Sequence, residues 1–170
     1  MSRVFTIGYE GLRIEDFLST LGRMEIRALA DVRALPLSRK PGFSKNALRA
    51  ALDRVGIRYL SFRSLGDPKE GRDAARAGKM AKFRAVYTAH LEGIGAKVAL
   101  EELAGLALST PTCLLCFERD PEVCHRLMIT DRLTAFHLQA QHIIAPLATE
   151  PFDYRVNVAR RHSRQGTAAA

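Results

Sequence analysis

The stretch Thr112-Cys113-Leu114-Leu115-Cys116-Phe117 is a continuous apolar run in the second half of the chain. Such a run is typical of a strand in a parallel sheet covered on both faces, because a strand with one face in water alternates apolar and polar residues. We therefore expect a buried strand here. Shorter runs of apolar or alternating residues predict four further strands, at residues 4–7, 26–32, 57–62 and 141–145.

Helical periodicity separates these predicted strands, with apolar residues recurring every three or four positions. Strands that alternate with helices form parallel βαβ units. The sequence therefore predicts an α/β fold, a three-layer α/β/α sandwich with a mostly parallel sheet. A single domain is expected over residues 1–150, followed by a basic, mobile tail over residues 151–170. The predicted helices cover residues 14–24, 44–55, 74–91, 96–108 and 121–138.

The composition indicates one globular domain in the cytoplasm. The chain has 170 residues and a mass of 18.8 kDa, and 47% hydrophobic with 26% charged residues exclude a disordered chain. Neither a membrane-spanning run nor a signal peptide is recognisable, so no membrane partner is predicted. The three cysteines lack a disulfide framework, which favours free thiols in a reducing compartment.

Positive charge is concentrated in one third of the sequence. Residues 27–84 hold 15 basic and 5 acidic side chains, whereas the rest of the chain holds 11 and 13. A segregated basic block points to an anionic partner more strongly than the net charge of +8 does. The alternative is a basic cytosolic protein whose charge has no specific partner.

In parallel sheets ligands bind beyond the carboxyl ends of the strands, so the residues that follow each predicted strand are candidates. The first strand leads into Gly8-Tyr9-Glu10-Gly11, a tight turn that allows a close backbone approach to a ligand and that is equally consistent with a plain connection. Tyr9 is the candidate side chain of this turn.

The second predicted strand ends in Asp31-Val32-Arg33, which places Asp31 and Arg33 on one strand face. Arg33 could hold a phosphate or a carboxylate bidentately while Asp31 orients it. Arg39, Ser44 and Lys45 follow, the last two at a predicted helix N-terminus, which suits an anion. The alternative is a buried Asp–Arg pair with a purely structural role.

The third predicted strand leads into a polar, basic loop over residues 63–73, with Arg63 and Arg72 as candidate ligand-binding residues. A loop of this length and composition is long enough to fold over a ligand. It is equally consistent with a surface connection.

The fourth strand leads to the residues with the richest chemistry. Glu118 directly follows the strand and is a candidate general acid or base. Cys124, His125 and Arg126 fall in the first turn of the next predicted helix, where the helix N-terminus and two neighbouring cations would favour a thiolate. Cys124 is therefore a candidate nucleophile, and His125 and Arg126 are candidate ligand-binding residues. The alternative for Cys124 is an inert core cysteine.

No metal and no cofactor are predicted. Cys113 and Cys116 have CxxC spacing, but residues three apart on a strand point to opposite faces and cannot share an ion. Cys116, Glu118, Cys124 and His125 could converge on zinc, yet no second pair with ligand spacing supports such a site.

Four motifs taken together are more specific than any of them alone. They are Thr6-Ile7-Gly8-Tyr9-Glu10-Gly11, Asp31-Val32-Arg33 with Pro36 to Lys45, Leu65-Gly66 with Lys69-Glu70-Gly71-Arg72-Asp73, and Cys116-Phe117-Glu118 with Asp120-Pro121 and Cys124-His125-Arg126. In this order they resemble the domain-of-unknown-function 488 family over about Val4 to Ile144, with Asp67 to Arg72 in place of the family's glycine- and arginine-rich loop. The resemblance implies a compact α/β domain whose motifs gather at one end of the sheet, and it implies no particular reaction.

Two functional hypotheses follow. The first is a domain that binds a phosphorylated small molecule, such as a nucleotide, or a nucleic acid in a basic cleft at the strand ends. The second is an enzyme in the same cleft, with Cys124 as nucleophile or Glu118 as general acid or base on an anionic substrate.

Overall fold

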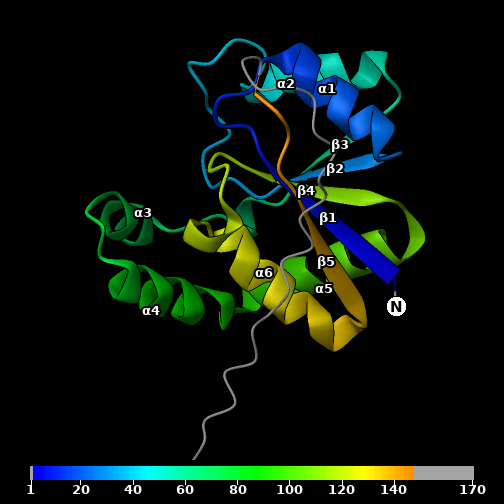
Figure 1. Cartoon of the computed structure of the whole chain (residues 1–170). Helices are drawn as coiled ribbons and strands as arrows, with labels where there is room; N and C mark the ends of the chain where they lie inside the picture. The colour runs from blue at the N-terminus through cyan, green and yellow to red at the C-terminus, as the bar shows by residue number, and fades with distance from the viewer. Residues whose placement is uncertain (1, 148–170) are drawn as a thin grey trace, which may run out of the picture.

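A computed structural model describes residues 2–147 and contains one sheet of five strands, all parallel (Figure 1). The α/β sandwich predicted from the sequence is therefore confirmed, whereas the proposed tail over residues 151–170 lies outside the described residues. The order across the sheet is β3-β2-β4-β1-β5. The strands are β1 (Ser2–Gly8), β2 (Ala28–Asp31), β3 (Arg58–Ser61), β4 (Thr112–Cys116) and β5 (Leu138–Ile143).

Helices cover both faces of the sheet in two groups, as Figure 1 shows. One face packs against α1 (Ile14–Arg23) and α2 (Lys45–Arg54). The other packs against α5 (Ile94–Ser109) and α6 (His125–Leu133); α4 (Met80–Leu91) packs on these two helices, and α3 (Lys69–Arg76) packs on α4. Short 3-10 turns lie at Arg63–Leu65, Pro121–Val123 and Thr134–Phe136.

The apolar run that predicted a buried strand forms β4, and all five of its residues are buried. Successive side chains of a strand point to opposite faces. Leu114 accordingly joins the core beneath α4, α5 and α6, whereas Cys113 and Leu115 join the core beneath α1 and α2. Cys113 and Cys116 therefore face opposite ways, as the sequence predicted.

Two of the predicted helices are broken where the backbone turns left-handed. The helix expected over residues 74–91 is split into α3 and α4 at Gly78, whose φ is +70°. The helix expected over residues 121–138 is reduced to α6 between two 3-10 turns, and His137 with φ +60° ends the segment. Much of the loop expected over residues 63–73 is helical as well, because α3 begins at Lys69.

The connections of β4 and its neighbours diverge at the carboxyl edge of the sheet. Its neighbours β1 and β2 lead into α1 and α2 on one face, whereas β4 leads into α6 on the other face. Chains that leave adjacent strand ends toward opposite faces form the topological switch point at which α/β proteins bind ligands. The end of β4 is therefore the first place to look for a functional site.

No helix within residues 2–147 combines the length and the apolar character needed to cross a bilayer.

Candidate functional site at the carboxyl edge of the sheet

Two cysteines, a histidine and a glutamate meet at the end of β4. The Sγ of Cys116 lies 3.0 Å from Oε2 of Glu118 and 3.6 Å from Nδ1 of His125. The Sγ of Cys124 lies 3.9 Å from the same Nδ1. The ligand atoms of Cys116, Cys124 and His125 all lie within 4.8 Å of one another, and all three residues are buried.

Local structure explains why these side chains converge. Asp120 accepts a hydrogen bond from the backbone N–H of Glu122 at 2.9 Å and starts a 3-10 turn with Pro121 at its first position. This turn carries the chain over the end of the sheet, so that Cys124 becomes the N-cap of α6 and His125 its first residue. The two residues thereby return to the strand end that carries Cys116.

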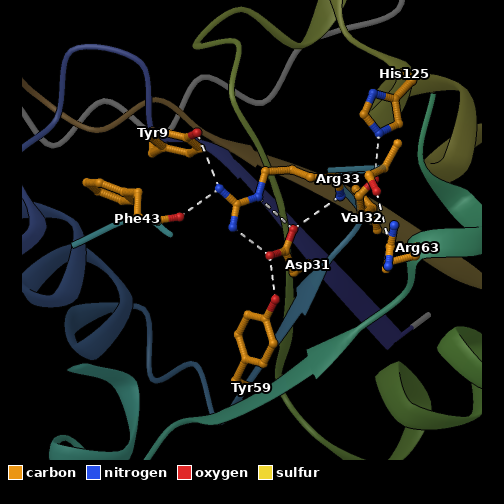
Figure 2. A network of polar contacts seen from close by, with 9 residues as sticks. Tyr9, Asp31, Val32, Arg33, Phe43, Tyr59, Arg63 and His125 are labelled. Carbon is orange, nitrogen blue, oxygen red and sulfur yellow. Dashed lines mark hydrogen bonds and ion pairs between the residues drawn. The ribbon is translucent and has the colours of Figure 1, made fainter. Parts of the chain in front are cut away.

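A second element holds the His125 ring in place. Its Nε2 lies 2.9 Å from the backbone oxygen of Val32, at the end of β2 (Figure 2). Because a carbonyl oxygen can only accept, Nε2 carries the proton, and in the neutral ring Nδ1 presents its lone pair to the two sulfur atoms. The ring of Tyr87 packs edge-on against His125, with the centroids 5.2 Å apart.

The electrostatics of the cluster favour a thiolate on Cys124. Burial opposes this ionisation, but the hydrogen bond from Cys116 and the charge of His125 outweigh it and bring the pKa of Cys124 well below its usual value. Burial raises the pKa of Cys116, and the neighbouring Cys124 adds to the effect. Burial alone would lower the pKa of His125, yet Cys124 raises it to about 9. The pKa of Glu118 is raised by burial and by the charge of Cys124.

Asp31 and Arg33 form a buried ion pair at the end of β2 (Figure 2). Nε and Nη2 of Arg33 donate to the two carboxylate oxygens of Asp31 at 2.8 and 2.6 Å. Nη1 donates to the hydroxyl of Tyr9 at 3.3 Å and to the backbone oxygen of Phe43 at 2.9 Å. The hydroxyl of Tyr59 donates to Asp31 at 2.7 Å.

This network ties the segment that follows β2 to the sheet. Burial opposes the charge of Arg33, but the hydrogen bond and the charge of Asp31 prevail and raise the pKa of Arg33 above its usual value. Tyr9 stacks on Phe43 with the ring centroids 4.4 Å apart. Four of the five N–H groups of Arg33 are engaged with protein acceptors, so the structure shows the buried pair that the sequence allowed as an alternative. A ligand contact by Tyr9, Asp31 or Arg33 stays a prediction.

Arg126 is fully buried and holds the loop after β4. Nη1 donates to the backbone oxygen of Glu118, and Nη2 donates to that of Arg119 at 2.8 Å. Glycine at position 8 leaves room for this loop, since a Cβ there would lie 1.7 Å from the oxygen of Glu118. Arg126 thus shapes the backbone beside the cluster, and its binding to a ligand stays a prediction.

The other predicted ligand-binding residues lie toward solvent. Arg39, Lys45 and Arg63 are exposed, whereas Ser44 and Arg72 are partly buried. Nε of Arg63 donates to the backbone oxygen of Ala34 at 3.2 Å, which places it against the segment that follows β2. Arg72 instead donates to the backbone oxygen of Asp67 and belongs to α3.

Sequence reasoning missed three features of the structure. The partners of Arg33 include the backbone of Phe43 and, through Asp31, the hydroxyl of Tyr59, and neither has a signal in local sequence spacing. The packing of Tyr87 on His125 joins helices far apart in the chain. An open hollow of about 470 Å³ lies on α3 and the start of α4, away from the strand ends, and its cationic side chains are Lys69, Lys79 and Lys82.

Comparison with known proteins yields one match. A family model described as Domain of unknown function DUF488 matches residues 13–133. The matched range includes β2, β3, β4 and all of α6, and therefore the ion pair of Asp31 and the cluster around His125. No curated protein and no solved structure matches the chain.

Proposed function

The chain belongs to the DUF488 family, and from this premise we propose that it binds a phosphate-bearing ligand at the carboxyl edge of its sheet. The observation that carries the proposal is a group of exposed cations on one anchored segment. Arg39 and Lys45 belong to the stretch after β2, and Arg63 is hydrogen-bonded to that stretch through Ala34. We call Arg39, Lys45 and Arg63 the basic rim.

The basic rim is supported from below by the buried network. Arg33 binds both Asp31 in β2 and the backbone of Phe43, so the segment between them is held at its two ends. The backbone N–H of Lys45 also donates to the backbone oxygen of Pro36 at 3.0 Å. A loop held in this way loses less conformational entropy when it binds a ligand. The hydrogen bonds of Arg33 within the protein therefore support an anion site formed by the exposed cations of the basic rim.

The start of α2 adds to the attraction for an anion. Ser44 is its N-cap and makes no side-chain hydrogen bond to the helix, so its hydroxyl does not occupy the N–H groups of the second and third residues, although the N–H of Lys45 is taken by Pro36. No acidic residue stands in the first turn of α2, which would otherwise offset the positive end of the helix dipole. Phosphate groups are the anions for which helix N-termini of this kind are suited.

The ligand class is a nucleotide or a nucleic acid, and salt dependence separates the two. A nucleic acid releases counterions when cations neutralise its phosphates, so its affinity falls steeply with salt. A single nucleotide involves few phosphates and gives a shallow dependence. The local excess of positive charge over residues 27–84 favours the polymer.

Binding of a short fluorescent single-stranded oligonucleotide tests the proposal. The triple variant Arg39→Ala, Lys45→Ala, Arg63→Ala is expected to bind at least about tenfold more weakly, and the slope of log affinity against log salt is expected to become shallower by about 2. The expectation follows from the loss of three phosphate contacts at the basic rim. Fluorescence anisotropy across a salt series measures both quantities.

A second triple variant, Arg27→Ala, Arg54→Ala, Arg58→Ala, is the matched control. These arginines are also exposed, but Arg27 and Arg58 stand at the amino ends of β2 and β3 and Arg54 ends α2. Both triples remove three positive charges, so they differ only in position. Equal losses of affinity in the two variants would reduce the effect to net charge and would contradict the proposal.

The alternative function is an enzyme in the same place. It is favoured by the position of Glu118 and Cys124 beside His125 at the switch point of the sheet. In such an enzyme Cys124 acts as nucleophile or Glu118 as general acid or base on an anionic substrate held by the basic rim. Turnover would then be lost in Cys124→Ser while ligand binding persists.

A further inference from the structure

We infer that Cys116, Cys124 and His125 form a zinc site, with the two sulfur atoms and Nδ1 of the imidazole as ligands. The inference rests on the placement of these three atoms and is independent of phosphate binding at the basic rim. The cluster draws on two elements, the end of β4 and the start of α6, and both are held by buried packing.

The two sulfur–nitrogen distances are close to those of a zinc tetrahedron. With Zn–S bonds of about 2.3 Å and Zn–N bonds of about 2.0 Å at tetrahedral angles, sulfur and nitrogen stand about 3.5 Å apart. Nδ1 of His125 lies 3.6 Å from the Sγ of Cys116 and 3.9 Å from the Sγ of Cys124. The two sulfur atoms lie within 4.8 Å of each other, and about 3.8 Å separates two sulfur ligands on one tetrahedral zinc ion, so zinc binding needs at most about 1 Å of adjustment between them.

The surroundings of His125 are those of a metal ligand. Histidines that bind zinc commonly donate their second ring N–H to a backbone carbonyl, which fixes the ring and directs the lone pair of the other nitrogen at the metal. Here the backbone oxygen of Val32 holds Nε2 at 2.9 Å, and Nδ1 faces both sulfurs. The packed ring of Tyr87 further limits rotation of the imidazole.

Comparison with Cys113 supports a special role for Cys116 and Cys124. Cys113 is as buried as Cys116 and Cys124, but it lies among apolar side chains on the other face of the sheet, and its sulfur approaches only a backbone oxygen at 3.7 Å. Cys113 thus illustrates an inert core cysteine of this same chain. Cys116 and Cys124 instead gather an imidazole and a carboxylate around them.

The donor set selects the metal. Two thiolates and one imidazole suit zinc, whereas magnesium and calcium require oxygen ligands. Glu118 touches Cys116 at 3.0 Å but does not belong to the group of atoms that lie mutually within 4.8 Å. Within residues 2–147 three ligands converge, one fewer than a closed structural zinc site uses and the number that catalytic zinc sites draw from the protein. Glu118, in contact with Cys116, is the neighbouring group able to hold or move a proton.

Metal analysis of the full chain tests the inference. Protein produced in zinc-supplemented medium and purified without chelators is expected to contain about one zinc per chain. Substitution of Co²⁺ for zinc is expected to give the visible absorption of a tetrahedral cobalt site together with thiolate-to-cobalt charge transfer. This spectrum needs no variant, so it keeps the test valid should a ligand substitution prevent folding.

Variants assign the ligands. Cys116→Ser, Cys124→Ser and His125→Ala are each expected to lower bound zinc to no more than about a tenth of the wild-type content. Cys113→Ala is the matched control and retains full zinc content. Glu118→Gln also retains zinc, because Glu118 is not one of the three ligands.

Three results would overturn the inference. The first is a wild-type chain that takes up neither zinc nor cobalt. The second is zinc content unchanged in the three ligand variants, which would place the metal elsewhere. The third is rapid alkylation of Cys124 at neutral pH in protein that carries its full zinc content, because a zinc-bound thiolate would be protected. Loss of zinc with intact oligonucleotide binding, or the reverse, separates this site from the basic rim.

Discussion

Replacing Asp31 with asparagine is expected to lower the free energy of unfolding by about 3–5 kcal/mol, the range for breaking one partner of a buried ion pair. Asp31 is fully buried and accepts from Nε and Nη2 of Arg33 and from the hydroxyl of Tyr59. The backbone N–H of Arg33 also donates a hydrogen bond to the Asp31 carboxylate, at 3.1 Å. A neutral amide in place of this carboxylate would leave the guanidinium buried without a counter-charge.

Urea unfolding followed by circular dichroism measures this effect. The matched control is Asp16→Asn, because Asp16 also pairs with an arginine at 2.8 Å, but Arg13 is 65% exposed. A surface pair of this kind contributes about 0–1 kcal/mol. A loss in Asp31→Asn no larger than that in Asp16→Asn would show that the network at the end of β2 does not hold the site together.

Gly8→Ala is the second change with a large expected effect. A Cβ at this position would lie 1.7 Å from the backbone oxygen of Glu118 and 2.4 Å from its carbonyl carbon. These are backbone atoms that Arg126 holds from the other side, so they cannot move aside as a flexible side chain would. We expect a loss of about 3 kcal/mol or more, at the upper end of the costs of overpacking.

Thermal or urea unfolding of Gly8→Ala measures the loss, and Gly22→Ala is its control. Gly22 lies in α1, and a Cβ added there would meet nothing within 4 Å, so alanine is expected to raise stability by up to about 1 kcal/mol through helix propensity. Wild-type stability in Gly8→Ala would contradict the close approach of β1 to the loop after β4.

The fold could be predicted from the sequence because strand and helix periodicities differ. The apolar run over residues 112–117 indicates β4, and the alternation of side chains along a strand is enough to place Cys113 and Cys116 on opposite faces. The breaks near Gly78 and His137 were missed, because glycine within a helical pattern is often tolerated and a left-handed histidine has no periodic signature.

The candidate site could be predicted only in outline. The rule that ligands bind beyond the carboxyl ends of parallel strands directed attention to the edge of the sheet where Cys116, Cys124 and His125 meet. The rule could not tell which cations there have N–H donors left for a ligand. Arg33 is engaged by Asp31, Tyr9 and Phe43, contacts that depend on how distant segments pack. Arg63 stays exposed, although Arg63 follows β3 at the same distance as Arg33 follows β2.

The most direct test of the central claim maps where a phosphate ligand binds. In ¹⁵N–¹H spectra of the full chain titrated with the same oligonucleotide, we expect the largest amide shifts in residues 34–45 and at Arg63, with smaller shifts near Glu118. The competing surface is the hollow on α3 and α4, which carries Lys69, Lys79 and Lys82 together with Glu70 and Asp73. Shifts confined to that hollow, or none at the carboxyl edge of the sheet, would contradict the account.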